Sequence, residues 1–122
     1  MRIRTFDTPL TVCKVADIGM VDLSRELTFV GVTDAEVSVA CPTSCVPMQT
    51  VAREDGWRGM RIEGQLDFSL VGILAKISDV LARAGIALFA VSTYDTDYVL
   101  VKDADFAAAC DALAAAGYEL CR

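Results

Sequence analysis

A polar segment, residues 92–97, separates two apolar segments, 86–91 and 98–101, and this pattern restricts the available folds more than any other part of the chain. Apolar segments of this length are typical of strands. Asp95 and Thr96 would be sufficient to form a turn between them. The segment therefore predicts a β-hairpin whose tip carries more polar side chains than its turn requires, which makes the tip a candidate binding rim. The surplus polar residues are Ser92, Thr93, Tyr94 and Asp97.

A helix is predicted on each side of this hairpin. In residues 70–83 the apolar side chains recur at helical spacing, as expected for an amphipathic helix. Ser69 is placed to cap its first turn, and Gly85 stands where a left-handed C-terminal cap would fall. The second helix is expected to begin at Asp103 or Ala104.

Two further strands, 57–63 and 118–121, complete the order β-α-β-β-α-β. This order predicts an α+β fold of the ferredoxin-like type, with an antiparallel sheet and both helices on one face. Residues 1–54 have a similar order but only short turns, 20–26 and 42–46, in place of the helices. We therefore expect two subdomains packed together, 1–54 and 55–122, of which the first is a degenerate copy. The strands expected in the first are 10–15, 27–32, 36–41 and 49–53.

Composition excludes several classes of function. The 122 residues are 54% hydrophobic and carry a formal net charge of −6, so a phosphate backbone would be repelled and nucleic acid is not an expected partner. No segment has the length of a membrane-spanning helix, and the basic N-terminus is not followed by a signal-peptide core. Since residues 86–91 are apolar on both faces, we expect a buried interface and a homo-oligomer.

The five cysteines and the absence of histidine argue against catalysis and metal binding. The cysteine spacings are irregular, and histidine is both the commonest general base and the commonest metal ligand. We expect reduced thiols in a cytoplasmic protein that acts without a cofactor and is not an enzyme. The alternative, a small enzyme with Cys41 or Cys45 as nucleophile, would lack an activating histidine.

The β-α-β-β-α-β order, together with the segments 64–69, 71–75 and 92–101, resembles the ACT domain superfamily. Within it, the string from Ser92 to Tyr98 is similar to the tandem-ACT group that includes the CASTOR-type cytosolic arginine sensors, and related units regulate aspartate kinases. The resemblance implies a sensor or regulatory subunit that binds a free amino acid between two ACT units. It also implies that any enzyme under its control is a separate chain.

An amino-acid site needs amide donors for the carboxylate and oxygen acceptors for the ammonium. The start of the first long helix has unpaired amides and a favourable dipole end. Asp97 is the best candidate for binding an ammonium or guanidinium group, although it could instead cap the hairpin turn. For Gly72, tight helix packing is an equal alternative to ligand binding. By resemblance, the candidate contacts are Ser69, Val71, Gly72, Ile73, Thr93, Tyr94 and Asp97.

The sequence leaves the identity of the ligand open. Arginine suits the acidic rim, while lysine and threonine remain candidates. A second hypothesis, from a different class, is a structural dimerisation module whose polar rim only solubilises the hairpin. Stabilisation of the fold by an amino acid would distinguish the two, because a ligand that binds only the folded state raises the melting temperature.

Overall fold

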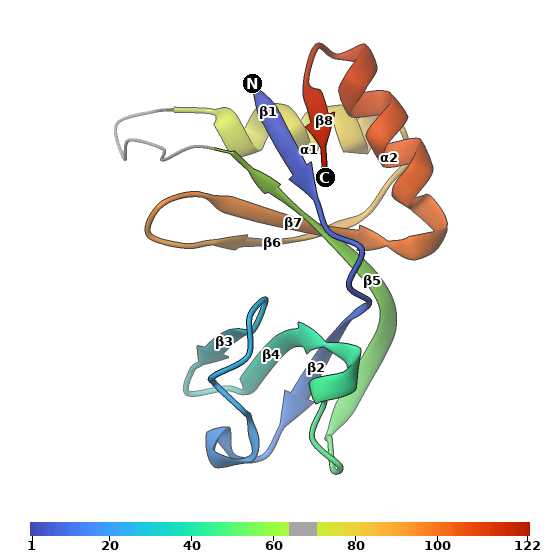
Figure 1. Cartoon of the computed structure of the whole chain (residues 1–122). Helices are drawn as coiled ribbons and strands as arrows, with labels where there is room; N and C mark the ends of the chain where they lie inside the picture. The colour runs from blue at the N-terminus through green and yellow to red at the C-terminus, as the bar shows by residue number, and fades with distance from the viewer. Residues whose placement is uncertain (64–70) are drawn as a thin grey trace. The chain divides into compact units, whose positions relative to one another are not determined.

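The computed structural model describes residues 1–63 and 71–122, and its strands and helices follow one another in the predicted β-α-β-β-α-β order (Figure 1). The strand from Asp97 begins and ends where the sequence indicated. The second helix begins at Asp103, one of the two predicted positions. The elements are β5 (Ala52–Ile62), α1 (Ile73–Arg83), β6 (Leu88–Ser92), β7 (Asp97–Lys102), α2 (Asp103–Ala115) and β8 (Glu119–Cys121).

The chain divides into two compact units that differ from the predicted 1–54 and 55–122. Met1–Asp7 and Arg58–Arg122 form the C-terminal unit, and Thr8–Trp57 forms the N-terminal unit. The difference arises because the first residues form a strand that the sequence did not predict, β1 (Arg2–Thr5), which lies between β5 and β8. The strand is antiparallel to β5 and parallel to β8, so the sheet is mixed, whereas an antiparallel sheet was expected.

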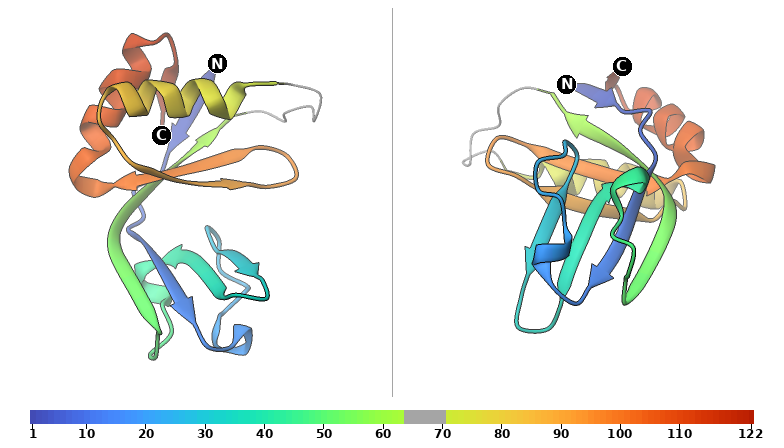
Figure 2. Two further views of the ribbon diagram at one scale, coloured as in Figure 1. Left: turned by 180° about the vertical axis from the view of Figure 1, so that it is seen from behind. Right: turned by 60° about the horizontal axis from the view of Figure 1, so that its bottom comes forward.

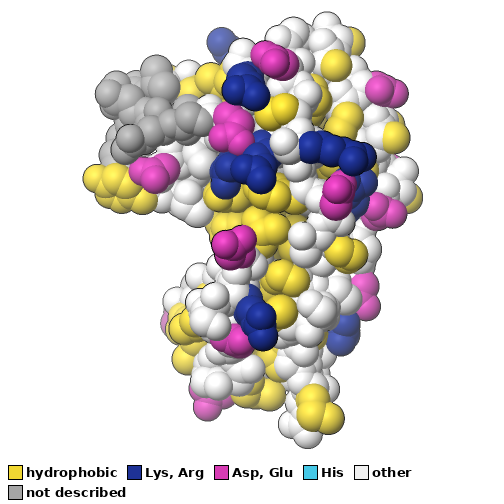
Figure 3. Space-filling model, viewed as in Figure 1, with side chains coloured by type: hydrophobic (Ala, Val, Ile, Leu, Met, Phe, Trp, Pro, Cys, Tyr) yellow, Lys and Arg dark blue, Asp and Glu magenta, His cyan; other side chains and the backbone are white. Residues whose placement is uncertain are grey.

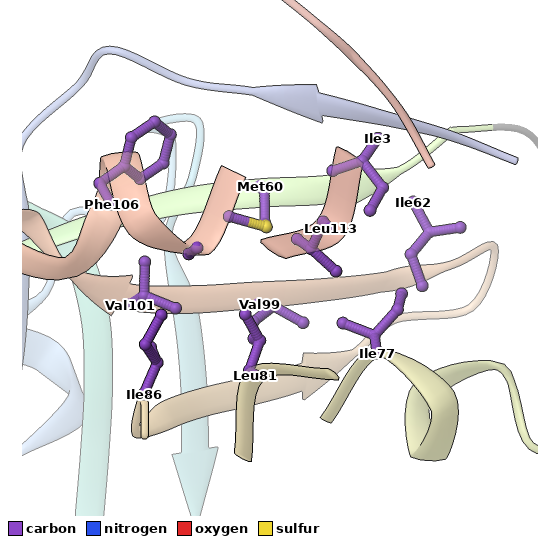
Figure 4. Packing of buried hydrophobic residues seen from close by; sticks show 11 residues of the cluster. Ile3, Met60, Ile62, Ile77, Leu81, Ile86, Val99, Val101, Phe106 and Leu113 are labelled. Carbon is purple, nitrogen blue, oxygen red and sulfur yellow. The ribbon is translucent and has the colours of Figure 1, made fainter. Parts of the chain in front are cut away.

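The core of the C-terminal unit lies between its sheet and its two helices (Figure 2). The strand order is β6-β7-β5-β1-β8, which is the ferredoxin-like order with β1 inserted. Side chains of both helices point toward those of β5 and β7 in the core (Figure 4). The predicted apolar stripe of α1 is confirmed, with Ile77 and Leu81 fully buried.

The C-terminal end of α1 agrees with the sequence, and its N-terminal end does not. Gly85 adopts a φ of +74°, the left-handed conformation expected of a helix cap, and the Ile86 amide donates to the Leu81 carbonyl at 2.9 Å. The helix begins at Ile73 with Gly72 as its N-cap, rather than at residue 70. Ser69, the predicted cap, lies outside the described residues.

The N-terminal unit repeats the same order with short 3₁₀ turns in place of helices, as its sequence predicted. Its strand order, β3-β4-β2-β5, matches that of the C-terminal unit without β1. Helical stability comes mainly from packing an apolar face, and three-residue turns have little face to pack. The elements are β2 (Leu10–Val15), η1 (Ile18–Met20), β3 (Phe29–Val32), β4 (Val37–Pro42) and η2 (Thr43–Cys45).

Strand β5 belongs to both units. Its first half pairs with β2, and its second half pairs with β1. The sequence predicted two separate strands, 49–53 and 57–63, divided at residues 54–56. The structure joins them, so β5 is the last strand of the first repeat and the first strand of the second.

The two hairpins of the chain support the interpretation of the N-terminal unit as a degenerate repeat. Strand β7 begins and ends sixty residues after β4, and the end pair Ser92–Asp97 corresponds to Val32–Val37. The fold is therefore an α+β arrangement of two ferredoxin-like units in which the first has lost its helices.

All five cysteines are unpaired, and two of them pack in the N-terminal unit as the small apolar residues that were expected. Cys13 on β2 and Cys41 on β4 are buried with Val15 and Val39. The thiols therefore serve the core in place of larger aliphatic side chains.

Candidate functional site

The tip of the β6–β7 hairpin is closed by its own threonine. The Thr93 amide donates to the Thr96 carbonyl at 2.8 Å, and the Thr93 hydroxyl donates to the same oxygen at 3.0 Å. The β3–β4 hairpin uses the same arrangement, in which Thr33 donates twice to the Glu36 carbonyl. Because both hairpins share it, this bonding is a turn motif, and Thr93 has a structural role whatever else it binds.

The polar pair that follows is found at only one of the two hairpins. The Ser92 hydroxyl donates to Asp97 Oδ1 at 2.5 Å across the hairpin, where the other hairpin has Val32 opposite Val37. A valine pair would be sufficient to form the ladder. The Ser92–Asp97 pair is therefore the surplus polar feature that the sequence indicated. Its hydrogen bond joins two strands and does not cap the turn, which was the alternative for Asp97.

A buried threonine ties the hairpin tip to the end of β5. Thr96 is almost fully buried, and its hydroxyl donates to the Ile62 carbonyl at 2.7 Å. This bond links two segments 34 residues apart in the sequence. It holds the tip against the last residues of β5 and so forms one wall of a cavity.

The cavity at this place has a volume of about 270 Å³ and a mostly polar lining. The end of β5 and the hairpin tip supply the described residues around it. They are Arg61, Ile62, Glu63, Thr93, Asp95, Thr96 and Tyr98. One guanidinium, two carboxylates, two threonine hydroxyls and a phenol thus converge on a space of small-molecule size.

Arg61 is the central charged group of this cavity. It donates to the Tyr98 hydroxyl at 3.3 Å and to Glu63 Oε1 at 3.2 Å, and its guanidinium lies 5.8 Å from the centre of the Tyr98 ring and 5.4 Å from that of Phe6. The hydrogen bond to Tyr98 is the main cause that raises the pKa of Arg61. The side chains of Arg61 and Glu63 are 26% and 29% exposed, so both are held in place yet accessible.

The helix start and the hairpin tip, which the sequence proposed as two sides of one site, lie at the same end of the C-terminal unit (Figures 1 and 2). Thr93 is the only one of the proposed residues among the described residues that line the cavity. Tyr94 is 77% exposed, and Val71 is 90% exposed. Ser69 lies outside the described residues. Gly72 and Ile73 form the start of α1, and Asp97 is bonded to Ser92.

Backbone conformation explains Gly72 better than packing does. Its φ is +81°, a region that residues with a Cβ rarely adopt. An added Cβ would meet no atom within 4 Å among the described residues. Tight packing against a strand, the alternative considered for this glycine, is therefore not its reason.

Sequence reasoning missed most of the cavity. Arg61 and Glu63 alternate with buried residues on β5, which placed them on one strand face without suggesting a site. The missing information was the pairing of β7 with β5, which brings Tyr98 beside Arg61. Asp95 was interpreted as a solvated turn residue, yet it lines the cavity.

The chemistry of the buried thiols does not suit a nucleophile. Burial raises the pKa of the Cys41 thiol to about 11, and the neighbouring Cys13 and Cys45 thiols act in the same direction. A thiol with this pKa is protonated near neutral pH, whereas thiol nucleophiles react as thiolates. Within the described residues, no group of three or more acidic or cysteine side chains could hold a metal ion.

The raised pKa of Cys41 predicts a loss of stability in alkaline solution. The folded value, about 11, lies above the ordinary value of 9.0, so the unfolded chain releases this proton first. The free energy of unfolding should therefore be unaffected below about pH 9 and should fall as the pH rises toward 11, by up to about 1 kcal/mol per pH unit. Urea unfolding at a series of alkaline pH values would measure this fall.

Two variants separate this effect from other alkaline effects. Cys41→Ala should show a shallower fall, while Cys121→Ala, at a half-buried position on β8, should behave like the parent chain. An equal fall in the parent and in Cys41→Ala would contradict the prediction. Cys13 and Cys110, whose burial also raises their pKa, would then be the thiols to replace next.

Neither helix in residues 1–63 and 71–122 combines the length and the apolar character that a membrane-spanning helix requires. On the visible face of the C-terminal unit, basic and acidic side chains alternate (Figure 3). The site is therefore set in a surface of mixed charge.

Comparison with known proteins places this geometry in a family. The ACT domain family model matches residues 52–115. The human cytosolic arginine sensor for mTORC1 subunit 1 is 37% identical over 73 residues, which are 59% of this chain and 22% of that protein. The chain thus matches less than a quarter of this relative's length.

Two solved structures have a similar fold. Protein Atu0741 from Agrobacterium tumefaciens has a TM-score of 0.86 and 26% identity, with 98% of this chain and 90% of that chain covered. The aspartate kinase of Clostridium acetobutylicum has a TM-score of 0.63 and 12% identity, with 87% of this chain and 32% of that chain covered, and shows likeness of fold alone. The family match spans more than half of the chain and includes β5, both helices and the hairpin with its cavity. The chain belongs to the ACT domain family.

Proposed function

We propose that this protein is a non-catalytic regulatory module that binds a free amino acid at the hairpin end of its C-terminal unit. The ACT domain family is a regulatory family that includes amino-acid sensors. The human relative carries arginine sensing in its name. Family membership supplies the class of function, and the cavity supplies a place for the ligand.

The observation that carries this proposal is the polar cavity between the end of β5 and the hairpin tip. Its volume of about 270 Å³ is near the lower limit of ordinary small-molecule sites, roughly 300 Å³, and suits a ligand of amino-acid size. A free amino acid carries both an anion and a cation, and the cavity offers a guanidinium and carboxylates. Charge-assisted hydrogen bonds of this kind are the strong ones in binding sites.

The start of α1 offers further donors at the same end of the unit. First-turn amides have no partner within their helix and lie at its positive dipole end. We propose that the ligand also contacts Val71, Gly72 and Ile73, and that Thr93, Tyr94 and Asp97 complete the site from the hairpin, as does Ser69, which lies outside the described residues. A glycine at the helix start lets a ligand approach the backbone closely.

Regulation requires that the ligand favour one state of the protein over another. We propose that the chain forms a homo-oligomer, that the ligand binds at an ACT–ACT boundary between copies, and that a separate enzyme responds to the change. We further propose a cytoplasmic location, which the name of the human relative and the five unpaired thiols support.

Thermal unfolding in the presence of each common L-amino acid tests the proposal. A ligand that binds the folded state at a concentration of about a hundred times its Kd stabilises it by about 2.7 kcal/mol. For a domain of this size we expect the melting temperature to rise by about 5 °C or more with at least one amino acid. No rise with any of them would contradict amino-acid binding and favour a structural dimerisation module.

A further inference from the structure

We propose that the Arg61–Glu63 ion pair binds the charged head group of a basic amino acid, with Arg61 holding its carboxylate and Glu63 its ammonium, and that Asp95 selects the cationic side chain. This inference rests on the amino-acid binding proposed above. It goes further by naming the class of ligand and the residues that recognise each part of it.

The first argument is the position of the ion pair. Arg61 and Glu63 both line the cavity and join each other at 3.2 Å, with about a quarter of each side chain exposed. A pair in this setting is neither fully hydrated nor fully enclosed. A zwitterion could lie along the pair with its charges reversed, so that each charge of the ligand meets an opposite one.

The second argument concerns the donors of Arg61. A guanidinium has five N–H groups, and Arg61 uses one to reach Tyr98 and another to reach Glu63 among the described residues. The remaining donors allow a carboxylate to bind, in the two-pronged geometry that distinguishes arginine from lysine. Contacts with the rings of Phe6 and Tyr98 hold the guanidinium in place before a ligand arrives.

The third argument is that the walls of the cavity are fixed in advance. Thr96 is bonded to the carbonyl of Ile62, and Thr93 closes the turn between Thr93 and Thr96. Strand β1 pairs with β5 at Met60, Arg61 and Ile62, so the backbone beneath the ion pair is part of the sheet. A site that does not have to become ordered on binding loses less affinity to conformational entropy.

The fourth argument is the balance of charge. The described lining holds one cation, Arg61, and two carboxylates, Glu63 and Asp95. A neutral zwitterion would match the ion pair and leave Asp95 facing it with an uncompensated charge. A basic amino acid brings one more cation, so L-arginine or L-lysine fits this lining better than L-threonine or an acidic amino acid does.

Titration calorimetry of the full chain with four probes tests the assignment of the head group. The probes are L-arginine, L-lysine, agmatine, which lacks the carboxylate of arginine, and δ-guanidinovaleric acid, which lacks its ammonium. We expect L-arginine or L-lysine to bind, and each analogue of arginine to bind about tenfold more weakly than L-arginine or worse. Binding of agmatine as tight as that of L-arginine would overturn the role of Arg61.

Variants assign each charge to its residue. Arg61→Gln should weaken L-arginine binding about tenfold and remove the preference for L-arginine over agmatine, because the partner of the carboxylate is gone. Glu63→Gln should remove the preference over δ-guanidinovaleric acid in the same way. Asp95→Asn should weaken L-arginine and L-lysine while leaving L-threonine unchanged. The matched control, Arg83→Gln, removes an exposed arginine that pairs with Asp79 on α1, and it should bind like the parent chain.

Far-ultraviolet circular dichroism and melting of each unliganded variant establish that it folds. If Arg61→Gln fails to fold, Arg61→Lys keeps the charge without the two-pronged geometry and should bind L-arginine several-fold more weakly.

The failure of this inference differs from the failure of the proposed function. Parent-like binding of L-arginine by Arg61→Gln, or binding of neutral amino acids in preference to basic ones, would overturn the inference and leave amino-acid sensing intact. Absence of binding by every common amino acid would overturn both.

Discussion

Replacing Leu81 with alanine is expected to reduce the free energy of unfolding of the protein by about 2–5 kcal/mol. Leu81 is fully buried on α1 and belongs to the cluster that β5, β7 and both helices share. Removing its branched end leaves a cavity, and the loss combines the transfer energy of the removed atoms with the cost of that cavity. Urea unfolding followed by circular dichroism measures the change.

The same substitution at an exposed leucine provides the control. Leu23 in the N-terminal unit is 64% exposed, so Leu23→Ala should change stability by less than about 0.5 kcal/mol. A loss of similar size in both variants would show that Leu81 is not a central residue of the core. Since domains usually unfold cooperatively, the slope of the transition should be the same as for the parent chain.

Replacing Phe106 with alanine is expected to destabilise the protein by about 3–5 kcal/mol. Phe106, in the first turn of α2, is almost fully buried, and the guanidinium of Arg58 lies 3.7 Å from the centre of its ring. The variant loses the apolar burial of the ring and the cation–π contact. Thermal and urea unfolding would both report the loss.

A double-mutant cycle with Arg58→Met separates these two effects. Arg58 also donates to the Phe6 carbonyl and to Asp7, so its replacement alone has several consequences. If the cation–π contact contributes, the losses in the two single variants should exceed that in the double variant by about 0.5–2 kcal/mol. Strictly additive losses would mean that Arg58 acts through Phe6 and Asp7 alone.

Most of the C-terminal unit could be predicted from the sequence because its signals are local. The apolar stripe of α1 has helical spacing, Gly85 is the kind of residue that ends a helix, and the hairpin has a polar tip. Each of these patterns depends on residues a few positions apart. They lead to the correct elements without any knowledge of long-range pairing.

Strand β1 could not be predicted for the opposite reason. Its four residues alternate between Arg2 and Arg4 on one side and Ile3 and Thr5 on the other, which is too short a pattern to separate from chance. What makes it a strand is pairing with Ile62 on β5 and Leu120 on β8, far away in the sequence. Burial of Ile3 in the core then favours that pairing.

The candidate site could be predicted in position but not in its residues. The polar surplus of the hairpin pointed to the correct end of the unit. The charged side of the cavity, however, comes from Arg61 and Glu63 on β5, and only the pairing of β5 with β7 brings them to the hairpin. A resemblance to the ACT family names helix-start and hairpin residues, and so it would also have missed these two.

The shared strand β5 has a consequence for how such a chain can be divided. Strand β5 continues from Ala52 to Ile62 through the point where one unit ends and the other begins, so no linker is available for a cut. A fragment that begins or ends within these residues would lose a strand from one of its sheets. Two separately expressed halves would each need a copy of the whole segment, and an insertion there would interrupt both repeats at once. Gene duplication that produced such a pair therefore left the two copies dependent on a single piece of backbone, and they must be gained, lost or transplanted together.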